Sequence, residues 1–175
     1  DGDPGSLAPL YDVDGGLLGP ETELTHLRGY GDSRPVRIAN DAQGQVQLDV
    51  FGPVADLVHQ VTVGVGAAPS AGQWRLIEAM VAAVVDRWQE PDQGIWEFRQ
   101  APRHHLYTKV QCWVTLDRAL AVARAAGRTE PGEWVALRAV IAGDIETEGW
   151  KPAQGTFGAT YDGDHLDASV LAVGL

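Results

Sequence analysis

The sequence predicts a mostly α-helical fold. Apolar residues recur at spacings of three and four along several long stretches after residue 40, as they do on one face of a helix. The alternation of apolar and polar residues that is typical of strands is almost absent. Alanine and valine also occupy more than one face of these stretches. This distribution favours helices buried on more than one side, in concentric layers, over an isolated small bundle.

The first forty residues are an exception to the helical pattern. They are rich in glycine and proline, which predicts loops with short extended pieces. Within them, residues 10–18 predict a small hairpin with Asp14-Gly15 at its tip. A loop-rich segment of this length is not expected to stand alone, so we expect it to lie on the helical part.

The first helix is expected to start near Ala42 and to continue to about Val61. Asn40 and Asp41 are good N-cap residues for it. Pro53 removes one backbone N–H donor, which predicts a kink just before it. Four more helices are expected, at residues 71–89, 107–126, 129–146 and 164–175.

Composition limits the classes of function. The chain has 175 residues, enough for one domain with a core, and a formal net charge of −11 at pH 7. The excess of acidic residues argues against nucleic acid and against an anionic membrane surface as partners. A single cysteine, Cys112, excludes an internal disulfide framework and a cysteine-based zinc site. The longest apolar run, residues 79–85, is too short to cross a bilayer.

The start of the chain carries no signal-peptide pattern and no methionine, so we expect the natural N-terminus to be missing. Because neither an export signal nor a disulfide framework is visible, a cytoplasmic location is favoured. The five histidines show no metal-ligand spacing, and no metal site is predicted.

Residues 89–99 carry the most informative chemistry. Glu97 lies between Trp96 and Phe98, and desolvation of a carboxyl group disfavours its charged form. A glycosidase needs a protonated carboxyl group at the leaving oxygen, and an indole offers a flat face for a sugar ring. Arg99 complicates this interpretation. If the segment is an extended strand, Arg99 points the same way as Glu97, and its positive charge favours the charged form of the Glu97 carboxyl group. The alternative is a loop whose aromatic residues plug a core and whose Glu-Arg pair is a surface ion pair.

Several blocks, in order along the whole chain, resemble glycoside hydrolase family 15, which contains glucoamylases, glucodextranases and bacterial trehalase-type enzymes. The strongest two are DQGIWE (92–97) and PRHHLYTKVQCWVTLDRA (102–119). The others are PLYDVDG (9–15), GYGDSRPVR (29–37), QGQVQLDVFG (43–52), Tyr161 and LDAS (166–169). Each block alone is weak, but their ordered coincidence is fairly specific.

The resemblance implies an (α/α)6 barrel with the active site in a pocket at one end. It also implies inverting hydrolysis of α-glucosides, in which two carboxyl groups stand about 6.5–9.5 Å apart on opposite sides of the bond. The resemblance further implies that Glu97 is the general acid and that Trp96 is part of the wall that binds the sugar. Arg34, in the Arg-Pro block, is expected in the pocket. The polar residues Arg99 and Asp92 complete the candidate substrate-binding set, although such residues are more often solvated charges or ion-pair partners.

The sequence also departs from the family pattern. Phe98 stands where fungal glucoamylases have a second glutamate, as in the bacterial branch. The general base and an upstream Trp-x-Arg-Asp block are not found. The chain therefore resembles a middle fragment of the catalytic domain. We expect one partial (α/α)6 domain over residues 1–175, with 1–40 as the loop-rich segment and 41–175 as barrel helices.

The expected function is hydrolysis of O-glycosidic bonds in α-glucosides, without an organic cofactor. The expected partners are maltooligosaccharides, dextran-type glucosides or trehalose. An incomplete ring of helices exposes apolar surface, so self-association of the fragment is also expected. The alternative is a non-catalytic α-helical module that binds carbohydrate or protein, and a purely structural helical fragment is a third reading.

Overall fold

A computed structural model describes residue 8 and residues 10–174 of the chain. These residues fall into two compact units, 8–46 and 47–174, and each unit is described by itself. The helices α1 to α4 all lie in the second unit, and the described residues are mostly helical there, as the sequence predicts. Within the described part of the chain, every helix is too short or too polar to cross a lipid bilayer.

Unit 8–46 contains a two-stranded antiparallel sheet and little other regular structure. Strands β1 (Thr22–Glu23) and β2 (Arg37–Ile38) pair in the register Thr22 to Ile38. Two short 3-10 turns, η1 (Tyr30–Asp32) and η2 (Asp41–Gly44), follow the strands in turn.

The hairpin predicted at residues 10–18 is wrong, because only its turn is present. The Asp12 carboxylate accepts hydrogen bonds from the backbone N–H groups of Asp14 (2.9 Å) and Gly16 (2.7 Å). An aspartate side chain that takes backbone donors in this way closes a turn by itself and needs no strand ladder. The paired strands lie instead further along the chain.

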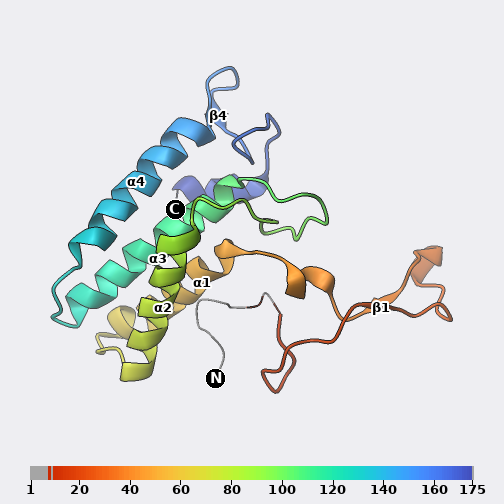
Figure 1. The fold of residues 1–175 in the computed structure, drawn as a ribbon, viewed down its shortest axis with the longest axis horizontal. Helices are drawn as coiled ribbons and strands as arrows, with labels where there is room; N and C mark the ends of the chain where they lie inside the picture. The colour runs from red at the N-terminus through yellow and green to blue at the C-terminus, as the bar shows by residue number, and fades with distance from the viewer. Residues whose placement is uncertain (1–7, 9, 175) are drawn as a thin grey trace. The chain divides into compact units, whose positions relative to one another are not determined.

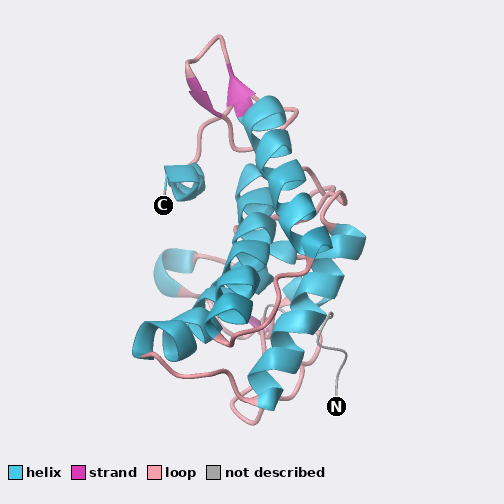
Figure 2. Cartoon of the chain, turned by 90° about the vertical axis from the view of Figure 1, so that its left-hand side faces the viewer, coloured by secondary structure: helices cyan, strands magenta, loops and turns pink. Residues whose placement is uncertain are grey.

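Unit 47–174 is built around helix α3 (Leu106–Ala125), which packs against α1 (Phe51–Thr62), α2 (Ala71–Arg87) and α4 (Gly132–Gly149). Figures 1 and 2 show α4 running back alongside α3 after a short connection. The 3-10 turns η3 (Leu48–Val50) and η4 (Val63–Val65) flank α1. Beyond α4, strands β3 (Trp150–Lys151) and β4 (Thr156–Phe157) form a hairpin, followed by η5 (Ala168–Gly174).

The second and third helices match their predicted ranges closely, whereas the other three differ. The first helix begins at Phe51 rather than near Ala42. Pro53 is therefore in its first turn, where a missing N–H costs no intrahelical hydrogen bond, and it marks the start of a helix instead of a kink. The fourth helix begins after Pro131, three residues later than predicted, and it also ends three residues later, at Gly149. The predicted last helix is the 3-10 segment η5.

The core lies where α3 meets its neighbours. Its fully buried members include Ile77, Met80, Val84, Leu116 and Ile141. Glycine is required at Gly52 of α1, because a Cβ atom there would lie 2.9 Å from the backbone oxygen of Gln111 in α3. Helices α1 and α3 therefore approach each other more closely than ordinary side chains allow.

Truncation of Leu116, which is fully buried on α3, should destabilise the protein strongly. We expect Leu116→Ala to lower the free energy of unfolding by about 2–5 kcal/mol, because it removes buried methyl groups and leaves a cavity. The matched control is Val140→Ala on the exposed face of α4, with an expected change within about 0.5 kcal/mol. Chemical denaturation followed by circular dichroism measures both, and equal effects would contradict a core centred on α3.

Candidate active site

The loop that carries Trp96 and Glu97 connects α2 to α3, and a buried lysine holds its start. Lys109, in the first turns of α3, is 1% exposed. Its ammonium group donates hydrogen bonds to the backbone oxygens of Trp88 and Glu90 (2.9 Å for Glu90). Burial lowers the pKa of Lys109. The lysine thus satisfies carbonyl groups that the C-terminal end of α2 leaves without helical partners.

A buried aspartate holds the next part of the loop. Both carboxylate oxygens of Asp92 accept from the Thr108 hydroxyl (3.0 and 2.9 Å), and Oδ2 also lies 3.4 Å from the Leu48 N–H. The Asp92 backbone pairs with Arg103 through two hydrogen bonds of 2.9 and 2.8 Å. Burial raises the pKa of Asp92 to about 7, against the opposing effect of the Thr108 hydrogen bond. Asp92, a predicted sugar ligand, is 1% exposed, and its described bonds are all to protein groups.

A tight turn over residues 94–97 presents Glu97. The Glu97 N–H donates to the Gly94 oxygen (3.0 Å), and the Gln47 side-chain amide donates to the same oxygen (3.2 Å). Gly94 has a φ of +67°, and a Cβ there would lie 2.7 Å from the His105 ring, so the turn requires glycine. Glu97 itself has a φ of +52°, which is strained for a residue with a side chain. The extended strand that would align Glu97 with Arg99 is therefore not formed.

The aromatic residues of the loop differ in their surroundings. Phe98 stacks on His105, with ring centroids 5.7 Å apart, and burial lowers the pKa of His105. Trp96 is 55% exposed, and its indole N–H donates to Oδ2 of Asp167 (3.0 Å). The loop thus has one aromatic ring packed on a neighbour and one indole that is largely open to solvent.

A second carboxyl group, on η3, interacts electrostatically with Glu97. Asp49 is 6% exposed, and its Oδ1 has no hydrogen-bond partner among the described residues. Burial raises the pKa of Asp49 to about 6, and the charge of Glu97 adds to that effect. Burial raises the pKa of Tyr107 on α3, and the charge of Asp49 adds a smaller effect in the same direction. Sequence reasoning missed this aspartate, although it lies in the QLDVFG block that carries part of the family resemblance.

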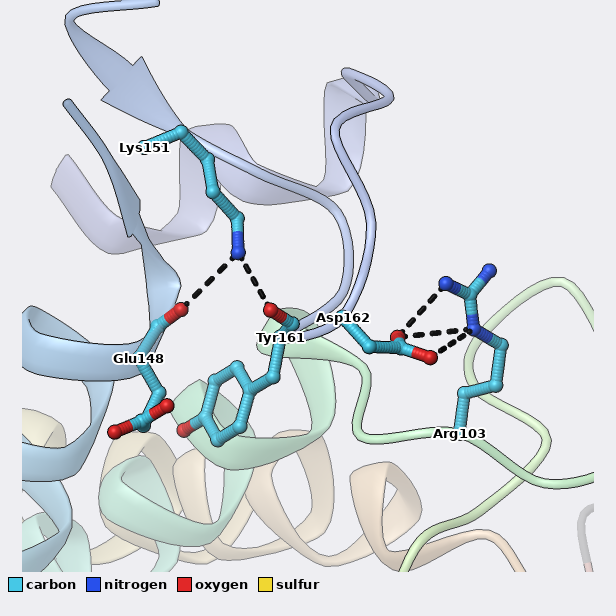
Figure 3. Close-up of polar contacts among 5 residues, drawn as sticks. All are labelled: Arg103, Glu148, Lys151, Tyr161 and Asp162. Carbon is cyan, nitrogen blue, oxygen red and sulfur yellow. Dashed lines mark hydrogen bonds and ion pairs between the residues drawn. The ribbon is translucent and has the colours of Figure 1, made fainter. Parts of the chain in front are cut away.

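The segment that follows α4 is held against the loop by polar contacts (Figure 3). Arg103 forms an ion pair with Asp162 (2.7 Å), and the Lys151 ammonium donates to the backbone oxygens of Tyr161 (2.6 Å) and Glu148 (3.3 Å). The ion pair joins the connection after β4 to the residues just before α3, and Lys151 of β3 ties the same connection to the end of α4. They bring Asp167, which lies 71 residues after Trp96, into the candidate site.

The two predicted arginines have different surroundings. Arg34 belongs to unit 8–46, where it borders a shallow hollow of about 380 Å³ together with Leu24 and Val36. Arg99 is exposed in the bend just after the turn. The roles of both arginines in binding substrate stay predictions.

Several ionisable groups thus meet at one end of α3, and their acid–base behaviour is testable through stability. The raised pKa of Asp49 means that the folded protein keeps a proton that the unfolded chain releases at lower pH. Between about pH 4 and pH 6, rising pH should therefore lower the free energy of unfolding. The reason is that Asp49 ionises in the unfolded chain at a lower pH than in the folded protein.

We expect Asp49→Asn to remove the part of this decline that Asp49 causes, on the order of 2–3 kcal/mol. Unfolding measured at a series of pH values tests it. Asp86→Asn, which changes an exposed carboxyl on α2, is the control and should leave the slope as in the wild type. If the free energy of unfolding of Asp49→Asn falls with pH as steeply as that of the wild type, Asp49 ionises at the same pH in the folded and unfolded states.

Comparison with known proteins adds independent information. The model of the family described as glycosyl hydrolases family 15 matches residues 6–175. A trehalase of Thermoplasma acidophilum is 36% identical over 166 residues, which cover 94% of this chain and 28% of the relative. A trehalase of Mycobacterium tuberculosis is 37% identical over 168 residues, which cover 95% and 24%. Trehalase 1 of Sulfolobus acidocaldarius is 33% identical over 172 residues, which cover 97% and 29%.

The chain thus spans about a quarter of the length of the curated relatives that it matches. No solved structure shows significant similarity to it. The family match extends over nearly every residue, including the loop with Trp96 and Glu97 and the segment with Asp167. The resemblance seen in the sequence blocks is therefore confirmed, and the chain belongs to glycosyl hydrolases family 15.

Proposed function

We propose that this chain is part of a glycoside hydrolase that cleaves α-glucosidic bonds, with trehalose as the first substrate to test. The observation that carries the proposal is the turn that presents Glu97 beside an exposed indole in a chain of this family. The choice of trehalose is supported by relatives that are named trehalases and match almost the whole chain. We also propose that helices α1 to α4 form part of an (α/α)6 barrel.

In this proposal Glu97 is the general acid. Its carboxyl group gives a proton to the glycosidic oxygen while the bond between that oxygen and the anomeric carbon breaks. A water molecule forms the new bond to the anomeric carbon from the opposite face and loses its proton to a second carboxylate. That general base is not assigned to a residue of this chain. Trp96 supplies a flat apolar face against which the glucosyl ring lies.

The surroundings of Glu97 support this role. Asp49 lies close enough for the charge of Glu97 to help raise its pKa, so a second carboxyl group stands beside the proposed acid. The strained backbone at Glu97 sets the direction in which its Cα–Cβ bond leaves the turn. Protonation of a leaving oxygen requires a carboxyl group that is presented to the glycosidic bond, and the turn supplies such a group in Glu97.

Replacement of Glu97 by glutamine tests the acid directly. In the full-length protein, we expect Glu97→Gln to lower kcat on trehalose by about 10²–10⁴-fold, because an amide cannot donate the proton. Glucose release measured at saturating substrate gives kcat. Glu90→Gln, the same change in an exposed residue of the same loop that pairs with Arg87, is the control and should retain near-normal turnover.

Near-normal turnover by Glu97→Gln would remove Glu97 from the mechanism. Binding of oligosaccharide without hydrolysis by the full-length wild type would support the non-catalytic module instead.

The anomer released at early times tests inversion separately. In trehalose both anomeric carbons have the α configuration, and one of them keeps its bond to oxygen. An inverting enzyme should therefore release equal amounts of α- and β-glucose before mutarotation, because water attacks the other carbon from the opposite face. Proton NMR of the anomeric region during the first minutes resolves the two forms. Release of α-glucose alone would indicate retention.

A further inference from the structure

The indole of Trp96 has one described polar partner, and that partner comes from a distant part of the chain. Its N–H donates to Oδ2 of Asp167, 3.0 Å away and 71 residues later. An indole that is 55% exposed packs against too little protein to have its orientation set by packing alone. A directional hydrogen bond at its only polar atom can set the plane of the ring.

Asp167 is itself held in place. Its other oxygen, Oδ1, accepts from the backbone N–H of Ser169 (2.8 Å), which orients the carboxylate at the start of η5. Burial by itself raises the pKa of Asp167, but the hydrogen bonds from Ser169 and Trp96 outweigh it and lower the pKa below its usual range. The carboxylate therefore stays ionised and able to accept from the indole at mildly acidic and neutral pH.

The segment that carries Asp167 is bound along its length to the residues before α3. The Leu106 N–H donates to the Ala159 oxygen (2.9 Å), and the Tyr161 N–H donates to the His104 oxygen (3.0 Å). The Ala159 N–H donates to the His165 oxygen (3.0 Å), which folds the segment back on itself two residues before Asp167. Together with the ion pair of Arg103 and Asp162 in Figure 3, these contacts give Asp167 a defined place beside the loop.

We propose that Asp167 is a positioning residue that sets the orientation of the Trp96 indole, so that the ring is ready to receive the glucosyl unit beside Glu97. The inference rests on the proposed function for the role of the ring in binding substrate. A ring held in its binding orientation before substrate arrives avoids the entropy loss of ordering it on binding. Asp167 acts through Trp96 and does not itself touch the substrate, so its loss should weaken binding more than it slows the chemical step.

The test uses the full-length protein labelled with ¹⁵N-tryptophan. The indole resonance of Trp96 is assigned by its disappearance in Trp96→Phe, which keeps an aromatic ring and removes the donor. Asp167→Asn keeps the size of the side chain and an acceptor for Ser169. Because the amide can rotate and offer its oxygen to Trp96 instead, Asp167→Ala, which offers no acceptor, is measured beside it. Asp164→Asn, an exposed carboxyl three residues earlier, is the matched control.

We expect Asp167→Ala to shift or broaden the Trp96 indole resonance and to raise KM for trehalose about threefold to tenfold, the effect of one hydrogen bond. We expect kcat to change by less than about threefold. In the Trp96→Phe background the same substitution should have no further effect on KM, because the interaction is already absent. Asp164→Asn should leave the resonance and both kinetic constants unchanged.

Three results would overturn the proposal. They are an unmoved Trp96 resonance in Asp167→Ala, an unchanged KM, or a KM increase of the same size in the Trp96→Phe background. The last of these would mean that Asp167 only stabilises η5. If the wild type hydrolyses no α-glucoside, the proposed function fails, whereas the indole resonance still decides whether Asp167 positions Trp96.

Discussion

The candidate site depends on two buried polar anchors at the start of α3, Thr108 and Lys109. Lys109 binds carbonyl groups at the end of α2, and Thr108 binds the carboxylate of Asp92, at the start of the loop. Buried polar and ionisable groups destabilise a protein unless they are hydrogen-bonded. Both anchors therefore favour the loop conformation that places the Asp92 carboxylate and the backbone oxygens within their reach. The opposite charges of Asp92 and Lys109 also favour each other, which partly offsets the cost of burying both.

The geometry of the loop follows from this attachment. Between this attachment and α3 the chain makes a tight turn, closed by the Glu97 N–H on the Gly94 oxygen, and His105 leaves no space for a side chain at Gly94. Gln47, directly before η3, binds the turn, and Asp49 two positions later lies where the charge of Glu97 reaches it. A half-buried glutamate on a strained turn is the consequence, and strain of this kind is typical of functional sites.

Much of the helical part could be predicted because its signals are local. The capping box of Ser70 and Gln73 and the apolar stripe after it define α2 from neighbouring residues alone. The start of α1 could not be predicted in this way, because apolar spacing continues before Phe51 although the backbone forms 3-10 turns there. The burial of Lys109 could not be predicted from its neighbours either. Its environment is made by carbonyl groups 19 and 21 residues earlier, which no local pattern reveals.

For the site the division is similar. Family membership and the pair Trp96-Glu97 could be recognised from short blocks of sequence, because the identity of a proton donor and of an aromatic ring depends on residue type. The participation of Asp49 and Asp167 emerged from folding. Asp49 lies 48 residues before Glu97 and Asp167 lies 71 residues after Trp96, and they reach the loop through packing of η3 and of the segment after α4. The same is true of the conformation of Glu97. The local sequence did not define the conformation of this segment, and hydrogen bonds from Gln47, Thr108 and Arg103 hold the loop that forms the turn.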